Sequence, residues 1–346
     1  MADNNNNNNT NPRYDHQMLA LALALPFVKM NKDEIRTEFL SEKEAFIEKH
    51  GNNNFFNDIA DYVNTFTSDN YLCKYYDINS FNSKHSKNEY IYPKICHLNI
   101  RSLNLHKHEL AAYLECLNST FDIILLTECG HALKTSIEEV FQNYELYMSP
   151  PTTNKGGAGI LIHRNLYQSI EIIDNNELST CTYVGCNKCK AESIWVKINT
   201  FNNDMIVIGC IYRHPGGNVS HFNEQYQKFL ESINKNETGI IGGDFNIDLL
   251  HFEKNTATGD YLTINLENNF TPCITLPTRI TPQTATLIDH IFVKLPVKNL
   301  QTKVSSGNLL CSISDHLMNF VLLELLELGN KKQRNVHMFV SLPRIK

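Results

Sequence analysis

The stretch Gly239-Ile240-Ile241-Gly242-Gly243-Asp244-Phe245-Asn246-Ile247-Asp248 is the most informative segment of this chain. Its isoleucines are typical of the end of a buried strand, and two glycines after a strand let the backbone turn sharply and approach a ligand closely. If the chain stays extended beyond them, Asp244 and Asn246 point the same way, because side chains alternate along a strand. A carboxylate beside a carboxamide suits binding of a hard cation, or holding a water molecule against a phosphate. On this segment alone, a strand end followed by an Asx turn is an equally good interpretation.

The composition indicates a folded protein with a modest negative charge. The 346 residues suffice for one large domain with extensions, and an apolar content of 42% predicts a sizeable core. The net charge is −6, and residues 93–325 hold 17 Lys and Arg against 23 Asp and Glu, which alone gives 17 − 23 = −6. This balance argues against a protein that passively coats nucleic acid, which needs a basic surface. A metal-dependent enzyme remains compatible, since a bound cation neutralises part of the acidic charge.

The cysteines and apolar segments indicate the cellular compartment of the protein. Several of the ten cysteines lie in apolar runs, as is typical of buried, reduced thiols in an intracellular protein. The apolar run 18–28 is too short to span a bilayer, and its upstream flank makes a poor signal peptide. We therefore expect a nuclear or cytoplasmic protein that is neither secreted nor associated with a membrane. The short basic cluster at 331–334 is interpreted as part of a solvated tail.

Four segments are distinguishable along the chain. Residues 1–14 form an asparagine-rich tail that we expect to be disordered. Residues 15–92 are interpreted as a helical extension followed, from residue 66, by a polar linker. Residues 93–325 form the main domain, and residues 326–346 a basic tail. The N-terminal helices carry no evident chemistry and are candidates for binding a protein partner; the sequence leaves the oligomeric state open.

Short apolar runs alternate with helical patterns in the main domain. The runs predict strands, and the patterns predict helices at 105–118, 219–234 and 256–269. The strands are predicted at 94–99, 122–127, 157–163, 193–199, 204–212, 238–242, 287–293 and 318–325. Many strands with fewer helices favour a core of packed sheets with helices outside.

Polar residues recur where these apolar strands end. Each taken alone has a structural explanation, such as a turn, a helix cap or simple packing. Six in one domain are harder to dismiss. They lie in the segments Leu98-Asn99-Ile100-Arg101-Ser102-Leu103, Ile123-Ile124-Leu125-Leu126-Thr127-Glu128, Gly209-Cys210-Ile211-Tyr212-Arg213-His214, Gly243-Asp244-Phe245-Asn246, Thr286-Leu287-Ile288-Asp289-His290 and Ser314-Asp315-His316.

In this order, the six segments resemble the endonuclease/exonuclease/phosphatase superfamily. The closer resemblance is to the apurinic-like endonuclease domain of non-LTR (LINE-type) retrotransposons. It is carried by the first segment, by Gly156-Gly157-Ala158-Gly159-Ile160 and by Leu276-Pro277-Thr278-Arg279-Ile280-Thr281. The resemblance covers about residues 93–325. It implies a four-layered α/β sandwich of two mixed β-sheets flanked by helices.

The resemblance also implies a metal site. Glu128 matches the residue that binds Mg²⁺ directly, with Mn²⁺ as an alternative ion. Asn99 matches the residue that helps to hold the ion or its water, and Asp315 a supporting acid near the metal. Mg²⁺ is often held by one or two carboxylates together with phosphate and water, so a sparse set of ligands is sufficient.

The remaining matched positions are implied to act on the phosphate. Asp244 matches the residue that orients or deprotonates the attacking water, and Asn246 its neighbour at the scissile phosphate. Tyr212 matches a phosphate-contacting tyrosine, and His316 a histidine that Asp289 orients as a cation for the phosphate. Two weaker correspondences, Arg213 and Arg279, are equally well explained as DNA-backbone contacts or as surface ion pairs.

The expected function is therefore nicking of DNA by a metal-dependent phosphodiesterase; in a retrotransposon, the nick supplies the primer for reverse transcription. One alternative is a phosphomonoesterase or lipid phosphodiesterase on the same fold, since fold does not fix substrate. Another is a catalytically inactive domain that binds DNA or protein. Cys181, Cys186 and Cys189 lack an obvious fourth ligand, so a structural zinc site there stays open beside the interpretation as free thiols.

Overall fold

A computed structural model describes residues 73–85, 91–149, 151–152, 156–173, 191–201, 203–281, 284–296 and 302–324. The predicted asparagine-rich tail, the helices predicted within 15–65, the cysteines at 181–189 and the basic tail lie outside these residues. No helix of the described residues is long and apolar enough to cross a membrane.

Two large mixed sheets form the centre of the molecule. The first has seven strands in the order β1-β14-β15-β2-β3-β5-β4. These are β1 Cys73–Tyr76, β14 Lys303–Leu309, β15 Met318–Glu324, β2 Ile91–Asn99, β3 Ile123–Thr127, β5 Ala158–His163 and β4 Tyr144–Ser149. The second has six strands in the order β10-β13-β9-β8-β7-β6. These are β10 Thr271–Pro272, β13 Asp289–Lys294, β9 Thr238–Asp244, β8 Met205–Arg213, β7 Ala191–Thr200 and β6 Tyr167–Ile172.

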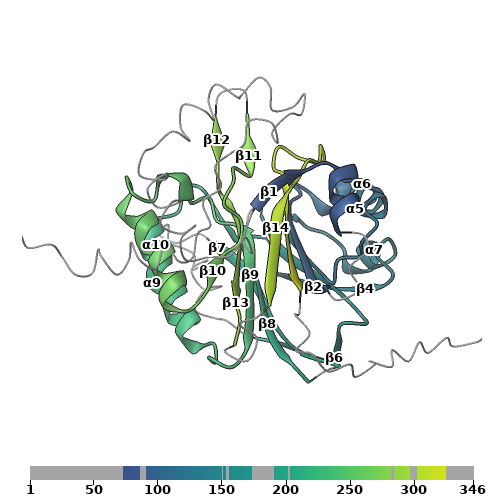
Figure 1. Ribbon diagram of the computed structural model, residues 1–346, viewed down its shortest axis with the longest axis horizontal. Coiled ribbons are helices and arrows are strands. Elements are labelled where there is room, and N and C mark those ends of the chain that lie inside the picture. The colour runs from purple at the N-terminus through teal and green to yellow at the C-terminus, as the bar shows by residue number, and fades with distance from the viewer. Residues whose placement is uncertain are drawn as a thin grey trace, which may run out of the picture.

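Helices cover the outer face of each sheet, which gives the predicted four-layered α/β sandwich (Figure 1). The seven-stranded sheet is covered by α5 Ile78–His85, α6 Leu103–Cys116 and α7 Lys134–Glu138. The six-stranded sheet is covered by α9 Val219–Ser232 and α10 Thr256–Glu267, with the short helix η2 Leu249–His251 between β9 and α10. A small hairpin of β11 Arg279–Ile280 and β12 Ala285–Thr286 lies at the top of the molecule in Figure 1.

The apolar runs that predicted strands are buried on both faces. In β3, Ile123 and Leu125 belong to the core between the sheets, whereas Ile124 and Leu126 pack with the helices on the outer face. Alternate residues of a strand point to opposite faces, so a strand between two apolar layers must be apolar throughout. The strands and helices predicted within residues 93–325 all occur, with boundaries shifted by a few residues.

The prediction of a polar linker over 66–92 is wrong for Cys73–His85. These residues form β1 and α5, and β1 extends the seven-stranded sheet by pairing in parallel with β14. Phe81 of α5 is fully buried against the outer face of that sheet. The folded domain therefore begins earlier than residue 93.

Candidate active site

Three polar residues lie side by side across the six-stranded sheet. Asp244, the last residue of β9, is paired with Tyr212 of β8 on one side and with Asp289, the first residue of β13, on the other. Directly paired residues of neighbouring strands present their side chains on the same face. Residues far apart in the sequence therefore form one row across the ends of these three strands.

The seven-stranded sheet contributes Asn99 and Glu128, which lie next to this row at the ends of two central strands. Asn99 ends β2, and Glu128 follows β3, its parallel neighbour. The Asn99 amide donates to Glu128 Oε1 over 3.0 Å and to Asp244 Oδ2 over 2.8 Å. The Tyr212 hydroxyl donates to the same Glu128 oxygen over 3.2 Å. These bonds join the ends of the two sheets into one site.

The two glycines before Asp244 lie within β9 and not after it. The predicted turn is therefore absent, and the glycines serve close packing instead. A Cβ at Gly243 (φ +152°) would collide with the carbonyl oxygen of Ile211 on β8, and one at Gly242 would meet Leu125 Cδ1 at 2.6 Å. Because only glycine fits, the pair allows β9 to approach both β8 and the other sheet.

The chain leaves the extended conformation immediately after Asp244. Asn246 has a left-handed backbone (φ 48°), so the expectation that its side chain continues the alternation from Asp244 is wrong. Instead, the backbone N–H of Asn246 donates to Asp244 Oδ1 over 3.0 Å, as in an Asx turn. Its amide donates to the carbonyl oxygen of Arg213 over 2.7 Å. Asn246 thus fixes one oxygen of Asp244.

Arg213 supports this loop from the inside. The residue is 1% exposed, and its guanidinium donates to the carbonyl oxygens of Phe245, Gly217 and Asn246 over 2.6 to 2.8 Å. A buried guanidinium committed to three carbonyl groups is not placed to contact a DNA backbone. The prediction of Arg213 as a substrate contact is therefore not supported, and neither is a surface ion pair.

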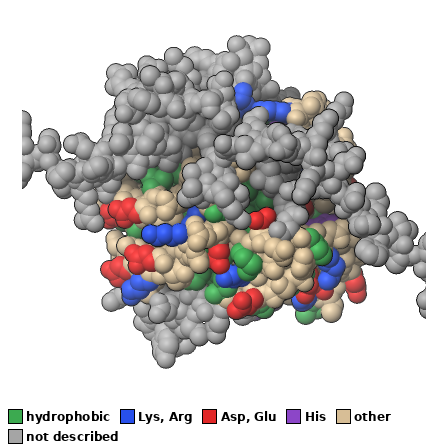
Figure 2. Space-filling model, turned by 60° about the horizontal axis from the view of Figure 1, so that its bottom comes forward, with side chains coloured by type: hydrophobic (Ala, Val, Ile, Leu, Met, Phe, Trp, Pro, Cys, Tyr) green, Lys and Arg blue, Asp and Glu red, His purple; other side chains and the backbone are tan. Residues whose placement is uncertain are grey.

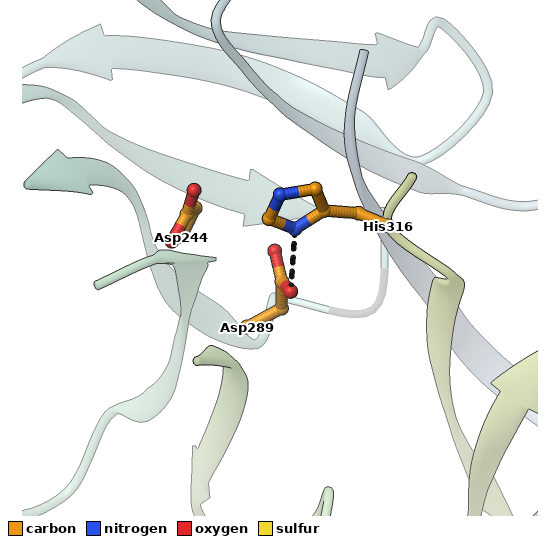
Figure 3. A group of neighbouring side chains, drawn as sticks. All are labelled: Asp244, Asp289 and His316. Atoms are coloured by element: carbon orange, nitrogen blue, oxygen red, sulfur yellow. Dashed lines mark hydrogen bonds and ion pairs between the residues drawn. The ribbon is translucent and has the colours of Figure 1, made fainter. Parts of the chain in front are cut away.

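His316 and Asp289 form a buried pair beside Asp244 (Figure 3). His316 Nδ1 donates to Asp289 Oδ2 over 2.8 Å, and the Thr278 hydroxyl donates to the same oxygen over 2.6 Å. The side chains of Asp289 and His316 are 0% and 6% exposed. With one ring nitrogen fixed in this way, the imidazole points toward Asp244 (Figure 3), and its second nitrogen, Nε2, lies 3.9 Å from Asp315 Oδ1.

Burial and neighbouring charges favour the neutral form of Asp244 and the charged form of His316. Burial, reinforced by the charge of Asp289, raises the pKa of Asp244 to about 7 against the opposing effects of His316 and Asn99. Burial alone would lower the pKa of His316, but the charge and hydrogen bond of Asp289, helped by Asp244, raise it to about 9. Near neutral pH the site therefore holds an imidazolium facing a carboxyl group poised to exchange a proton.

Tyr212 stays a neutral phenol. Burial and the negative charges of Glu128 and Asp244 all raise its pKa above the ordinary value. It can therefore donate a hydrogen bond but has no tendency to act as a base.

Two arginines hold Asp315 at the rim of the site. Arg279 donates from Nε and lies with Nη2 2.8 Å from Asp315 Oδ2, and Arg101 Nε lies 3.1 Å from Asp315 Oδ1. Burial raises the pKa of Asp315, but the hydrogen bond from Arg279 and the charges of His316 and the two arginines together lower it below the ordinary value. This carboxylate is thus neutralised by guanidinium groups and is not joined to Glu128 or Asn99.

A chain of buried polar side chains lies beneath the pair. His97 Nδ1 is 3.9 Å from the second oxygen of Asp289 and 3.2 Å from Asn319 Oδ1. The amide of Asn319 donates to Asn308 over 2.9 Å, and Asn308 donates to the carbonyl oxygen of Pro277 over 3.0 Å. The chain thus connects three strands of the first sheet with the loop that carries Thr278.

Several side chains could ligate a metal ion. Asp244, Asp289 and His316 offer ligand atoms within 4.8 Å of one another. Glu128 accepts the hydrogen bonds of Asn99 and Tyr212 at Oε1, so Oε2 could ligate an ion. Asn99 Oδ1, which accepts from the backbone N–H of Arg101 over 3.2 Å, is a second hard donor. Oxygen donors of this kind fit a hard divalent cation.

Sequence reasoning missed some residues of the site. Thr278 and Arg101 both lie inside segments that carried the family resemblance. The sequence did not indicate that Thr278 bonds to Asp289 or that Arg101 pairs with Asp315. His97 precedes Asn99 by two positions on a strand, and that spacing places both on the same face.

Comparisons with known proteins agree with this architecture. Residues 96–316 match the endonuclease/exonuclease/phosphatase family, whereas no curated protein matches the chain. The fold resembles that of the endonuclease domain of TRAS1, a telomere-specific non-LTR retrotransposon, with 16% identity over 68% of this chain and 99% of that chain (TM-score 0.50). It also resembles a family protein from Bacteroides vulgatus (16% identity, 67% and 98% covered, TM-score 0.50). A third such structure is D. rerio TDP2 complexed with a single-strand DNA product (14% identity, 66% and 98% covered, TM-score 0.50). The match over 96–316, together with the sandwich and its row of polar residues, confirms the resemblance: this chain belongs to the endonuclease/exonuclease/phosphatase family.

Proposed function

We propose that the protein is a Mg²⁺-dependent phosphodiesterase that nicks DNA, as in non-LTR retrotransposition. The observation that carries this proposal is the proximity of Asp244 and His316, which offer ligand atoms within 4.8 Å of each other. The pKa of Asp244 is raised to about 7 and that of His316 to about 9, and the imidazole points toward Asp244 (Figure 3). Near neutral pH the first accepts a proton from water, while the second stabilises charge on a phosphate.

The hydrogen bonds of the site support a separate role for each side chain in this proposal. Asn99 and the backbone of Asn246 each hold one oxygen of Asp244, which fixes the carboxylate that takes the proton of the attacking water. Asp289 keeps His316 charged and oriented toward the phosphate. The Tyr212 hydroxyl, held at Glu128, can turn to a phosphate oxygen as charge develops on it.

Glu128 and Asn99 are the residues that would hold Mg²⁺, with Mn²⁺ as an alternative. When bound there, the ion supplies Lewis-acid stabilisation of the phosphate charge. The group of Asp244, Asp289 and His316 is less suited, because metal ligation requires a neutral imidazole and His316 is held as a cation. Asp315 as a supporting metal residue stays a prediction that the two arginines do not favour.

DNA is the substrate that the similar folds favour. One is named as a retrotransposon endonuclease, and another carries a single-strand DNA product. On the face shown in Figure 2, the acidic and basic side chains of the described residues are interspersed, without one extended basic patch in view. Binding through local contacts at the site suits such a surface better than a broad electrostatic attraction.

The test is the nicking of supercoiled plasmid by the full chain with Mg²⁺ and with EDTA. Conversion to open circles in Mg²⁺ alone supports the proposal. The same preparation is assayed on a phosphomonoester and on phosphoinositide vesicles. A folded protein that binds the ion and hydrolyses only these substrates is a phosphatase or lipid phosphodiesterase. A folded protein that acts on none is a binding module.

The rate should depend on pH with two limbs. Asp244 acts as a base only when deprotonated, so activity rises through about pH 7; His316 acts as a cation only when protonated, so activity falls through about pH 9. Measurement of kcat/KM for nicking at saturating Mg²⁺ checks this bell shape. A rate that still rises steadily beyond the upper limb would contradict the role of the imidazolium.

Arg101 and Arg279 should contact the DNA backbone. Their side chains are 54% and 39% exposed at the rim of the site. Replacement of either by alanine is expected to raise KM for DNA severalfold and to lower the slope of log KM against log salt by about one, with kcat little changed. The matched control is Arg164→Ala, because this arginine is 48% exposed and also pairs with a carboxylate, that of Glu145. Unchanged salt slopes in the rim variants would contradict backbone contact.

A further inference from the structure

The row of polar residues continues onto a fourth strand. Glu192 of β7 is paired directly with Tyr212 of β8, which is paired with Asp244, which is paired with Asp289. Paired residues of neighbouring strands share a face, so the Glu192 carboxylate points to the same side of the sheet as the other three. No motif singled it out.

Glu192 is a buried and fully hydrogen-bonded carboxylate. The residue is 2% exposed, and it accepts hydrogen bonds from the backbone and hydroxyl of Thr152, from the backbone N–H of Gly157 and from His214 Nε2, the last over 3.3 Å. Burial raises its pKa, but these donors outweigh burial and bring the pKa below the ordinary value. The site thus has an ionised carboxylate at its end, held by groups on two different loops.

The first of these loops sets the backbone of Glu128. Gly130 N donates to the carbonyl oxygen of Gly156 over 2.7 Å, and Cys129 N donates to that of Gly157 over 3.3 Å. Glu128 itself has a left-handed backbone (φ 55°), which a residue with a side chain keeps only when its surroundings hold it. By anchoring Gly157, Glu192 holds the turn that imposes this conformation.

The second loop sets the phenol that touches Glu128. The ring of His214 packs edge-on against the ring of Tyr212, with centroids 4.7 Å apart. The Tyr212 hydroxyl in turn donates to Glu128 Oε1 over 3.2 Å. Glu192 is therefore connected to Glu128 by two routes, through the backbone of the glycine turn and through the edge-to-face rings of His214 and Tyr212.

We propose that Glu192 is a positioning residue that presents Glu128 to the metal ion. The inference rests on the proposed function in so far as Glu128 is taken as the metal ligand. A glutamine keeps the size of the side chain, but its NH₂ group would face N–H donors that now point at carboxylate oxygens. The variant should therefore release the glycine turn or His214, and Glu128 would lose its orientation.

The test is direct binding of Mn²⁺, followed by electron paramagnetic resonance, in full-length wild-type protein and in Glu192→Gln. We expect the Kd for Mn²⁺ to rise about 10- to 100-fold, the range typical of lost partners around a metal site. The Mg²⁺ concentration for half-maximal nicking should rise in parallel, with KM for DNA unchanged. A purely structural role would lower the unfolding temperature without this selective effect on the metal.

A second variant protects the test against misfolding of the first. A Cβ at Gly156 would collide with the Glu192 carboxylate, so Gly156→Ala displaces it without changing charge and should weaken Mn²⁺ binding in the same direction. Glu145→Gln is the control, because this carboxylate accepts a hydrogen bond from Tyr167 over 2.7 Å and lies in neither loop. Wild-type Mn²⁺ affinity in both test variants would overturn the proposal.

Failure of the proposed function would look different. If the wild-type protein binds Mn²⁺ but nicks no DNA, the function is wrong, while weakened Mn²⁺ binding in Glu192→Gln still supports the positioning role. If the wild-type protein nicks DNA and both variants keep its metal dependence, the function stands and the positioning role is overturned.

Discussion

Replacing Asp244 with asparagine is expected to lower the rate of DNA nicking by about 10²- to 10⁴-fold, the usual contribution of a general base. The substitution keeps the shape of a side chain that is 1% exposed and fixed by Asn99 and by the backbone of Asn246. It removes the group that accepts the proton of water. A neutral amide avoids the cost of burying a charge beside Asp289, but its NH₂ group would face one of the two N–H donors that now bond the carboxylate, so the unfolding temperature of the variant is measured alongside its rate.

Single-turnover nicking at saturating Mg²⁺ measures this effect without interference from product release. The acidic limb of the pH profile should disappear with the base. Asp122→Asn is the matched control: burial also raises the pKa of this carboxyl, to about 6, but it lies at the end of β3 opposite Glu128. A loss of activity equal in both variants would show that Asp244 matters only for folding.

Much of the fold was predictable because burial leaves a mark on composition. The strands at the centre of each sheet are covered on both faces, so β3 and β9 appear as short apolar runs. Strands at or near the edges of the sheets lack this mark. β6 is half exposed along its length, and β14 contains two serines, a glycine and an asparagine. β1 depends on pairing with β14, far away in the sequence, which no local pattern reveals.

The site was predictable in its residue types but not in its contacts. A motif can predict that Asp289 and His316 act together, and the structure joins them over 2.8 Å. A motif does not show which face of a strand is exposed to solvent. Arg213 was therefore interpreted as a surface residue, although it is buried. Glu192 could not be identified as a site residue for a related reason, since only the register between β7 and β8 places it beside Tyr212.

The substitution His316→Gln is expected to lower nicking by about 10²- to 10³-fold, because it removes a preorganised cation from the phosphate. Asp289→Asn should act through the same cation. Loss of the carboxylate charge that raises the pKa of His316 to about 9 would move the basic limb of the pH profile downward. Single-turnover rates across pH for both variants measure the two effects.

The double variant separates cooperation from independent damage. If Asp289 works only by keeping His316 charged and oriented, then Asp289→Asn should cost little more once His316 is already glutamine. His163→Gln is the control for loss of an imidazole, because β5 runs antiparallel to β3 and carries His163 to the end away from Glu128. Fully additive losses in the double variant would mean that Asp289 contributes separately, and its buried second oxygen near His97 would then be the place to look.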